Sequence, residues 1–323
     1  MKFVEVGGVR LSAIGLGTWQ FGSREWGYGE QYAEEESRRI VGRALDLGIN
    51  LIDTAEIYGF GASERIVGKA VAGRREEAFL ATKIFPVLPV GPVVADRARR
   101  SARRLGVDVL DLYQVHQPNP LVPDSLIMPP MRRLVDEGLV RNIGVSNYPL
   151  RRWQAADAAL GLPVLSNQVR YSLVDRRPEA ALLPWAQDRD RIVIAYSPLG
   201  QGLLSARYDA RNRPGGVRAA NALFLPENLE RAAELLEVLR AVAAAHDATP
   251  AQVALAWVIR RPNVVAIPGA SSVAQLERNA EAADLDLTDE DDERLTGASD
   301  RFSPVTGLPA VVGMARERFR RSA

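Results

Sequence analysis

The chain has 323 residues with 41 basic and 40 acidic side chains, and its net charge of +1 gives no electrostatic reason to expect binding to nucleic acid or to an anionic membrane. It contains no cysteine, which excludes disulfides, thiol catalysis and cysteine–zinc sites. The N-terminal residues lack the pattern of a signal peptide, so we expect a cytoplasmic location.

The first predicted element is a hairpin. Residues Met1–Leu11 hold Gly7-Gly8 between two short apolar runs, and a glycine pair between such runs is typical of a tight turn between two strands. We expect this hairpin to precede the main sheet and to close one end of it.

Eight short apolar runs then recur, most of them separated by about the length of one βαβ unit. Because they are apolar at nearly every position, they are typical of parallel strands that are covered on both faces. The predicted strands are Ile14–Gly17, Asn50–Asp53, Phe79–Lys83, Leu110–His116, Asn142–Ser146, Val164–Val169, Ile192–Tyr196 and Val264–Ile267. Amphipathic helices are predicted between them at Glu34–Leu47, Val93–Leu105, Leu126–Glu137 and Arg151–Ala159.

One predicted helix, Val93–Leu105, carries a dense group of arginines. Their helical spacing favours a solvated helix face over a binding site. The members of this group are Arg97, Arg99, Arg100, Arg103 and Arg104.

The interval between Tyr196 and Ile267 is longer than the repeat requires. It holds a long loop, Leu203–Leu225, and an added helix, Pro226–Ala245. The last barrel helix is predicted to begin at Thr249-Pro250, because threonine is a good N-cap and proline suits the first helical position. Long loops inside compact domains are usually functional.

Eight strands alternating with helices predict a closed (β/α)₈ barrel, an α/β fold that forms one domain over residues 1–323. The structural alternative is an open, doubly wound sheet. Such a sheet usually carries G-x-G-x-x-G after its first strand, whereas Gly15-Leu16-Gly17-Thr18-Trp19-Gln20 has glutamine at the third glycine position.

Polar residues stand at the C-terminal ends of the predicted strands, where the active site of such a barrel lies. Asp53, Lys83 and His116 end three successive strands, and Tyr58 lies in the loop after Asp53. Taken singly, the acid could cap a helix, the lysine could lie on the surface and the histidine could be structural. Because all four would meet at one rim, we expect a common chemical role.

The lysine is notable because the chain contains only three: Lys2, Lys69 and Lys83. Lysine can shift its pKa, whereas arginine stays charged. The combination favours proton transfer to a carbonyl oxygen, since an ammonium lowers the pKa of a nearby tyrosine from its usual value near 10 and a carboxylate holds the ammonium in place. A histidine can orient the substrate oxygen. None of these side chains supplies electrons, so a cofactor has to deliver hydride.

Three stretches of the sequence resemble the signatures of the aldo-keto reductase family, and the resemblance extends over residues 10–300. They are Gly48–Gly59 with Ser63-Glu64, Gly138–Asn147, and Ile267–Ser271 with Gln275-Leu276 and Asn279. The resemblance implies an NADP(H)-dependent oxidoreductase that reduces an aldehyde or ketone to an alcohol. It implies Tyr58 as general acid, with Lys83, Asp53 and His116 around it.

The same resemblance implies that the cofactor lies across the barrel mouth. Tyr196 would stack on the nicotinamide, and Arg278 either contacts the 2′-phosphate or adenine or is a surface residue of its helix. The implied cofactor-binding residues are Gly17, Thr18, Trp19, Asp53, Ser146, Asn147, Gln168, Tyr196, Ser197, Leu199, Gly202, Arg207, Gly269, Ser271, Gln275, Arg278 and Asn279. Gly269 departs from the family pattern, because many members have a lysine there.

We expect large apolar side chains on the loops after the first and third strands to form a substrate wall, since ligand pockets are mostly apolar and aromatic. Trp19, Trp26 and Phe85 would line it beside Tyr58 and His116. The alternative is that these aromatic side chains only pack the two loops together. The wall favours apolar or aromatic carbonyl compounds over hydroxylated sugars, although the sequence specifies neither a particular substrate nor an oligomeric state.

Two other functions are compatible with parts of the sequence. The β subunits of voltage-gated potassium channels share this fold and cofactor, so a regulatory cofactor-binding module is the main alternative. A hydrolase is disfavoured, because the chain has only two histidines and no H-E-x-x-H, and because Gly144-Val145-Ser146-Asn147-Tyr148 lacks the final glycine of a nucleophile elbow.

Overall fold

The computed structural model of this chain describes residues 1–22, 31–87 and 91–322. It begins with an antiparallel hairpin of β1 (Phe3–Val6) and β2 (Val9–Ser12). Gly7 and Gly8 form its turn with φ of 60° and 76°, the left-handed conformations that a two-residue hairpin turn needs. The amide of Gly7 donates to Asp190, which precedes a barrel strand, so the hairpin lies at the N-terminal end of the barrel as predicted.

Eight parallel strands follow in chain order around one sheet. They are β3 (Leu16–Gly17), β4 (Leu51–Asp53), β5 (Phe79–Ile84), β6 (Leu110–Val115), β7 (Val140–Ser146), β8 (Ser166–Arg170), β9 (Ile192–Tyr196) and β10 (Val264–Ala266). Parallel bridges join Ile14 to Ala266 and Gly17 to Gly269, which connects the first strand to the last. The predicted (β/α)₈ barrel is therefore confirmed, with small shifts in the strand ends.

Two buried layers hold the barrel together, because successive side chains on a strand point to opposite faces. Leu51, Ala81 and Leu112 belong to a cluster that fills the barrel interior beneath the hairpin. Their neighbours Ile52 and Leu80 belong to a second cluster, between the strands and the surrounding helices. This alternation decides which residues at the strand ends point into the mouth of the barrel.

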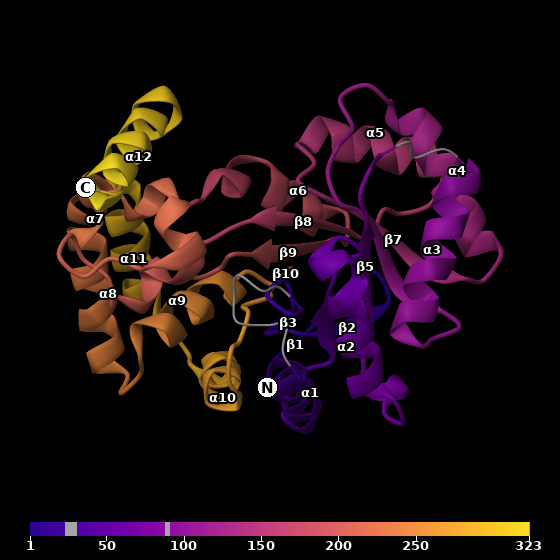
Figure 1. The fold of residues 1–323 in the computed structure, drawn as a ribbon, viewed down its shortest axis with the longest axis horizontal. Coiled ribbons are helices and arrows are strands. Elements are labelled where there is room, and N and C mark those ends of the chain that lie inside the picture. Colours follow the sequence, from indigo (N-terminus) through magenta and orange to yellow (C-terminus); the bar gives the residue numbers. More distant parts are fainter. Residues whose placement is uncertain (23–30, 88–90, 323) are drawn as a thin grey trace.

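Helices cover the outside of the sheet (Figure 1). They are α1 (Gln31–Asp46), α2 (Ala62–Val71), α3 (Gly91–Leu105), α4 (Asp124–Asp136), α5 (Leu150–Leu160), α6 (Leu182–Asp188), α9 (Pro250–Ile259) and α10 (Val273–Glu281). Far apart in sequence, α1 and α10 contact each other where the barrel closes. Helix α9 begins as predicted, with Thr249 in a capping box and Pro250 in the first turn.

The interval after β9 contains more structure than the sequence indicated. The predicted helix Pro226–Ala245 begins and ends as expected, but it is divided at Ala232 into α7 (Pro226–Arg231) and α8 (Ala233–Ala245). The side-chain amide of the buried Asn228 donates to the carbonyls of Ala222 and Val305 and so ties α7 to other segments. The chain ends with α11 (Asp289–Arg301) and α12 (Gly307–Ser322).

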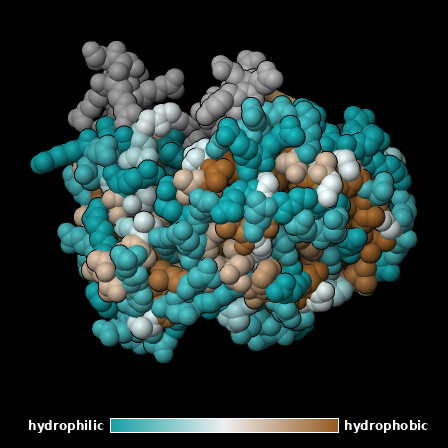
Figure 2. All heavy atoms as spheres, turned by 90° about the horizontal axis from the view of Figure 1, so that it is seen from below, coloured by the Kyte–Doolittle hydropathy of each residue, from teal (hydrophilic) through white to brown (hydrophobic). Residues whose placement is uncertain are grey.

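The surface of the molecule is largely polar on the face that Figure 2 shows, where hydrophobic residues occur in small groups among hydrophilic ones. Across the described part of the chain, no helix has the length and apolar character needed to cross a membrane. Two expectations stay predictions: that residues 1–323 form a single domain, and that the protein is cytoplasmic.

Candidate active site

The alternation along the strands places four polar side chains on the inner face of the barrel at its C-terminal end. Asp53 lies two positions after the interior residue Leu51, and Lys83 lies two positions after Ala81. Gln114 follows Leu112 in the same way on β6, and His116 follows that strand. Side chains two apart on a strand share a face, so all of these point into the mouth.

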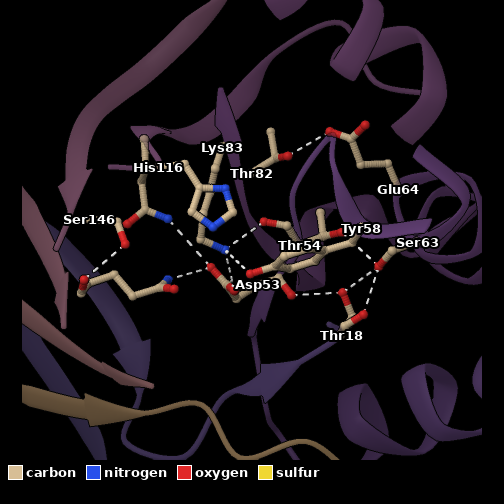
Figure 3. Close-up of polar contacts among 12 residues, drawn as sticks. Thr18, Asp53, Thr54, Tyr58, Ser63, Glu64, Thr82, Lys83, His116 and Ser146 are labelled. Carbon is tan, nitrogen blue, oxygen red and sulfur yellow. Dashed lines mark hydrogen bonds and ion pairs between the residues drawn. The ribbon is translucent and has the colours of Figure 1, made fainter. Parts of the chain in front are cut away.

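The ammonium of Lys83 is the centre of the group (Figure 3). It donates to Asp53 Oδ2 at 2.6 Å, to the carbonyl of Thr54 at 2.8 Å and to Tyr58 Oη at 3.3 Å. Lys83 is 0% and Asp53 2% exposed, so this ion pair is fully buried. A charge can be buried in this way only where it is paired and hydrogen-bonded, and both conditions hold here.

Tyr58 lies on a short irregular segment that the surrounding residues hold in place. Its amide donates to the carbonyl of Ala55 at 3.1 Å. Gly59 follows with φ of 54°, and a Cβ there would lie 2.9 Å from the carbonyl oxygen of Gly22, so a side chain would push the segment away. Ser63 contacts the hydroxyls of Thr18 and Thr54 at 2.7 and 2.9 Å, which fastens the end of the segment to the floor of the site.

The second carboxylate oxygen of Asp53 accepts hydrogen bonds from two glutamines. Gln168 Nε2 donates to Oδ1 at 2.7 Å and Gln114 Nε2 at 3.5 Å. Gln114 was not among the residues predicted from the sequence. Its signal was present, because a glutamine within the buried run of β6, two positions before His116, shares the face of that histidine.

His116 packs edge-on against two aromatic rings. Its ring centroid lies 5.7 Å from that of Tyr58 and 6.1 Å from that of Phe85, with interplanar angles of 79° and 78°. Burial, together with the positive charge of Lys83, lowers the pKa of His116 to about 3. The imidazole is therefore neutral and can donate a hydrogen bond from one ring nitrogen while the other has no proton.

The pKa values of Tyr58 and Lys83 are both above their ordinary values. Burial raises the pKa of Tyr58, and the charge of Lys83 offsets only part of this effect. The lowered pKa that the sequence suggested is thus wrong in its net direction. For Lys83, burial lowers the pKa, but the charge of Asp53 and the contact with Tyr58 outweigh it. At neutral pH the site holds an un-ionised phenol beside a charged ammonium.

Four of the predicted cofactor-binding residues form one chain of hydrogen bonds that ends at Asp53. Tyr196 Oη donates to Asn147 Oδ1 at 2.9 Å, and Asn147 Nδ2 donates to Ser146 Oγ at 3.1 Å. Ser146 Oγ donates to the carbonyl of Gln168 at 3.0 Å, and the side chain of Gln168 reaches Asp53. The structure thus brings these residues together next to the lysine.

The segment after β9 carries the next predicted group. Ser197 and Gly202 have φ of 51° and 102°, and Gly200 between them has φ of 54°. The amides of Gly200 and Gly202 donate to the carbonyls of Ser197 and Leu199, each at 2.9 Å, so the left-handed residues here belong to tight turns. Arg207 is exposed and contacts Ser205 Oγ at 3.3 Å.

The third predicted group surrounds the N-terminus of α10. Both the amide and the hydroxyl of Ser271 donate to Gln275 Oε1 at 2.9 Å, and Asn279 Nδ2 donates to the carbonyl of Gly269 at 3.4 Å. Arg278 is exposed and forms no ion pair with the part of the chain that the structure describes.

The remaining predicted residues lie near the first strand. Gly17 pairs with Asp53 across β3 and β4, and Thr18 is fully buried below the site with its hydroxyl donating to the carbonyl of Asp53. Trp19 is 49% exposed. Trp26, predicted for the substrate wall, lies outside the described residues. The roles of all these residues in binding stay predictions.

A phenol, an ammonium, a carboxylate and a neutral imidazole that meet in this way can move one proton to a substrate oxygen. The phenol holds the proton, and the ammonium stabilises the phenolate that remains. The imidazole can position the acceptor oxygen. The arrangement has no group that donates a pair of electrons, so a reduction here needs a hydride donor.

A family model, the Aldo/keto reductase family, matches residues 13–300. Among curated proteins, an uncharacterized oxidoreductase of Mycobacterium tuberculosis is 56% identical over 322 residues, which cover 99% of this chain and 100% of that protein. Methylglyoxal reductase YeaE of Escherichia coli is 34% identical over 87% of this chain and 89% of its own. A solved aldo/keto reductase from Klebsiella pneumoniae, in complex with NADP and acetate, is 32% identical with a TM-score of 0.74, and the match covers 95% of this chain and 97% of that one.

Proposed function

The chain belongs to the aldo/keto reductase family and is an oxidoreductase, and from this premise we propose that it reduces an aldehyde or ketone to an alcohol with NADPH, with Tyr58 as the general acid. The observation that carries the proposal is the buried contact of Lys83 with both Asp53 and Tyr58. The relatives named above are oxidoreductases. Their names therefore favour an enzyme over a channel-type regulatory module.

NADP(H) fits the residues at the mouth. The exposed Arg207 and Arg278 offer positive charge for phosphate groups. The similar protein from Klebsiella pneumoniae contains NADP, which supports the same cofactor for this chain. When bound, the cofactor supplies a hydride for the carbonyl carbon.

Side chains of the protein itself hold the proton and transfer it to the substrate. The neutral His116 donates a hydrogen bond to the carbonyl oxygen and places it near Tyr58 Oη. Tyr58 then gives its proton to that oxygen as negative charge develops there. Lys83 stabilises the resulting phenolate through its hydrogen bond, and Asp53 keeps the ammonium charged and in position.

Arg278 gives the first test of the cofactor assignment. We expect Arg278→Ala to weaken the binding of NADPH by about tenfold, because a charge-assisted hydrogen bond to the 2′-phosphate is lost. The binding of NADH, which lacks this phosphate, should not change. Fluorescence titration with both cofactors measures the two affinities, and Arg294→Ala, at an exposed arginine of α11, is the matched control. Equal affinities for NADPH in wild type and Arg278→Ala would show that Arg278 does not contact the cofactor and is only a surface residue.

Phe85 gives a test of the substrate class. We propose that the wall of Trp19, Trp26 and Phe85 favours aromatic or apolar carbonyl compounds over open-chain sugars. We expect the wild type to have a higher kcat/KM for benzaldehyde than for open-chain xylose, and Phe85→Ala to reduce this ratio by roughly 10–100-fold as apolar contact is lost. A wild-type preference for the sugar, or an unchanged ratio in Phe85→Ala, would contradict this assignment.

A further inference from the structure

The sequence favoured a solvated face for all five arginines of α3. The structure shows that two of them do not face the solvent. Arg99, Arg100 and Arg103 are exposed, but Arg97 and Arg104 turn inward and form ion pairs with Glu56 and Glu64. This division matters because Glu56 lies in the loop between Asp53 and Tyr58, directly beside the proposed active site.

Glu56 connects two loops of the barrel mouth. Its Oε1 accepts a hydrogen bond from the backbone amide of Phe85 at 2.6 Å, and its own amide donates to the carbonyl of Lys83 at 3.4 Å. Both partners stand at the end of β5 or just after it. The loop that carries Tyr58 is therefore tied to the loop that carries Phe85.

Arg97 holds Glu56 in this position. Its Nε donates to Glu56 Oε2 at 2.9 Å, and its Nη2 donates to Glu56 Oε1. Its Nη1 also donates to the carbonyl of Val87 at 3.2 Å, so one guanidinium contacts the carboxylate and the backbone beyond Phe85. The Glu56 side chain is only 10% exposed, so without Arg97 its charge would be left unpaired in a poorly hydrated place.

The position of Phe85 in turn matters for the reacting groups. The Phe85 ring packs edge-on against His116, and His116 also packs edge-on against the ring of Tyr58. A shift of the Phe85 backbone therefore changes both the substrate wall and the placement of the imidazole. A displacement of about 1 Å at a reacting group can cost roughly 10²-fold in rate.

We propose that Glu56, paired with Arg97, is a positioning residue that fixes Phe85 beside His116 and so gives the site its selectivity for aldehydes with a large apolar group. The selectivity rests on the proposed carbonyl reduction, whereas the positioning of Phe85 does not. Glu56 touches neither the substrate nor the cofactor in this account. It acts through the amide of Phe85.

The first experiment measures the positioning without any activity. Amide hydrogen exchange at Phe85 is followed by NMR in the full chain. We expect exchange at Phe85 to be about tenfold faster in Arg97→Met than in wild type, because the hydrogen bond to Glu56 is no longer held. Arg99→Met is the matched control, since Arg99 lies on the same helix and pairs with Glu137 at the surface. Unchanged exchange in Arg97→Met would overturn the proposal.

The second experiment measures selectivity with benzaldehyde, acetaldehyde and NADPH. We expect Arg97→Met and Glu56→Gln to raise KM for benzaldehyde by about tenfold, to change KM for acetaldehyde much less, and to leave the NADPH affinity unaltered. Arg97→Lys, which keeps the charge without the planar head, should recover part of the loss. A general structural defect would instead lower kcat for both aldehydes together and weaken NADPH binding, and that pattern would refute the positioning role.

The two experiments separate the two claims. If wild type reduces neither aldehyde but exchange at Phe85 still depends on Arg97, then the proposed function fails and the positioning of Phe85 stands. If wild type reduces benzaldehyde and Arg97→Met behaves as wild type in both experiments, then the positioning role fails and the function stands.

Discussion

Tyr58→Phe lowers kcat for carbonyl reduction by roughly 10²–10⁴-fold in our account, the loss that follows when a general acid is removed. The substitution takes away one hydroxyl and keeps the ring that packs edge-on against His116. Lys83 retains its contacts with Asp53 and the carbonyl of Thr54, so the buried charge stays paired. The NADPH affinity and the thermal midpoint should therefore remain close to those of wild type.

The measurement is a steady-state assay of NADPH oxidation with benzaldehyde, beside a cofactor titration of the same preparation. Phe60→Tyr, on the same segment at a side chain that is 96% exposed, controls for general disturbance of that segment. If Tyr58→Phe kept the wild-type kcat, another group would have to donate the proton and the assignment of Tyr58 would be wrong.

Lys83 gives the second large effect. Lys83→Met removes the charge that offsets the rise in the pKa of Tyr58, so this pKa goes up further and the phenol becomes a weaker acid. It also leaves Asp53 buried without its ion-pair partner, and breaking a buried pair in this way costs about 3–5 kcal/mol of stability. We therefore expect both a loss of kcat by roughly 10²-fold or more and a lower thermal midpoint.

Lys83→Arg separates these two effects, because it keeps the positive charge. The arginine head is longer and planar, and Lys83 is 0% exposed, so the guanidinium cannot take the position of the ammonium between Asp53 and Tyr58. We expect this variant to remain folded and to be nearly as slow as Lys83→Met. Wild-type rates for Lys83→Arg across the pH range would show that the contact with Tyr58 is not needed.

The pH dependence of the reaction follows from the two shifted groups. The pKa of Tyr58 is raised, so the phenol keeps its proton at neutral pH and loses it only in strongly alkaline solution. His116, with a pKa of about 3, is neutral throughout the neutral range and contributes no step near the usual histidine pKa of about 6.5. We therefore expect the proposed general acid to keep its proton over a broad pH range.

Much of the site could be predicted because the place of a residue on its own strand decides whether it lies at the mouth of the barrel. Asp53, Lys83 and His116 end apolar strands, and the C-terminal ends of such strands meet at one rim. The same reasoning could have predicted Gln114. The direction in which the pKa of Tyr58 shifts could not be predicted from the sequence. Burial and the charge of Lys83 have opposite effects on this pKa, and only the folded structure shows which effect is larger.

Other features depend on contacts between distant segments. Helix α2 went unpredicted partly because it contains Gly68, a poor helix former, and the structure gives its reason: a Cβ there would lie 2.5 Å from the carbonyl oxygen of Leu105 on α3. The break at Ala232 has no local signal, since alanine favours helix. The inward turn of Arg97 is set by Glu56, which the sequence separates from it by a whole βα unit.

The central claim is that this chain transfers hydride and a proton to a carbonyl group. The most direct measurement mixes the purified protein with NADPH and a panel of aldehydes, then compares the NADPH consumed with the alcohol formed. We predict alcohol formed in equal amount to NADPH consumed, with benzaldehyde among the better substrates. Tight NADPH binding without any alcohol from the panel would contradict the account and favour a cofactor-binding regulatory module.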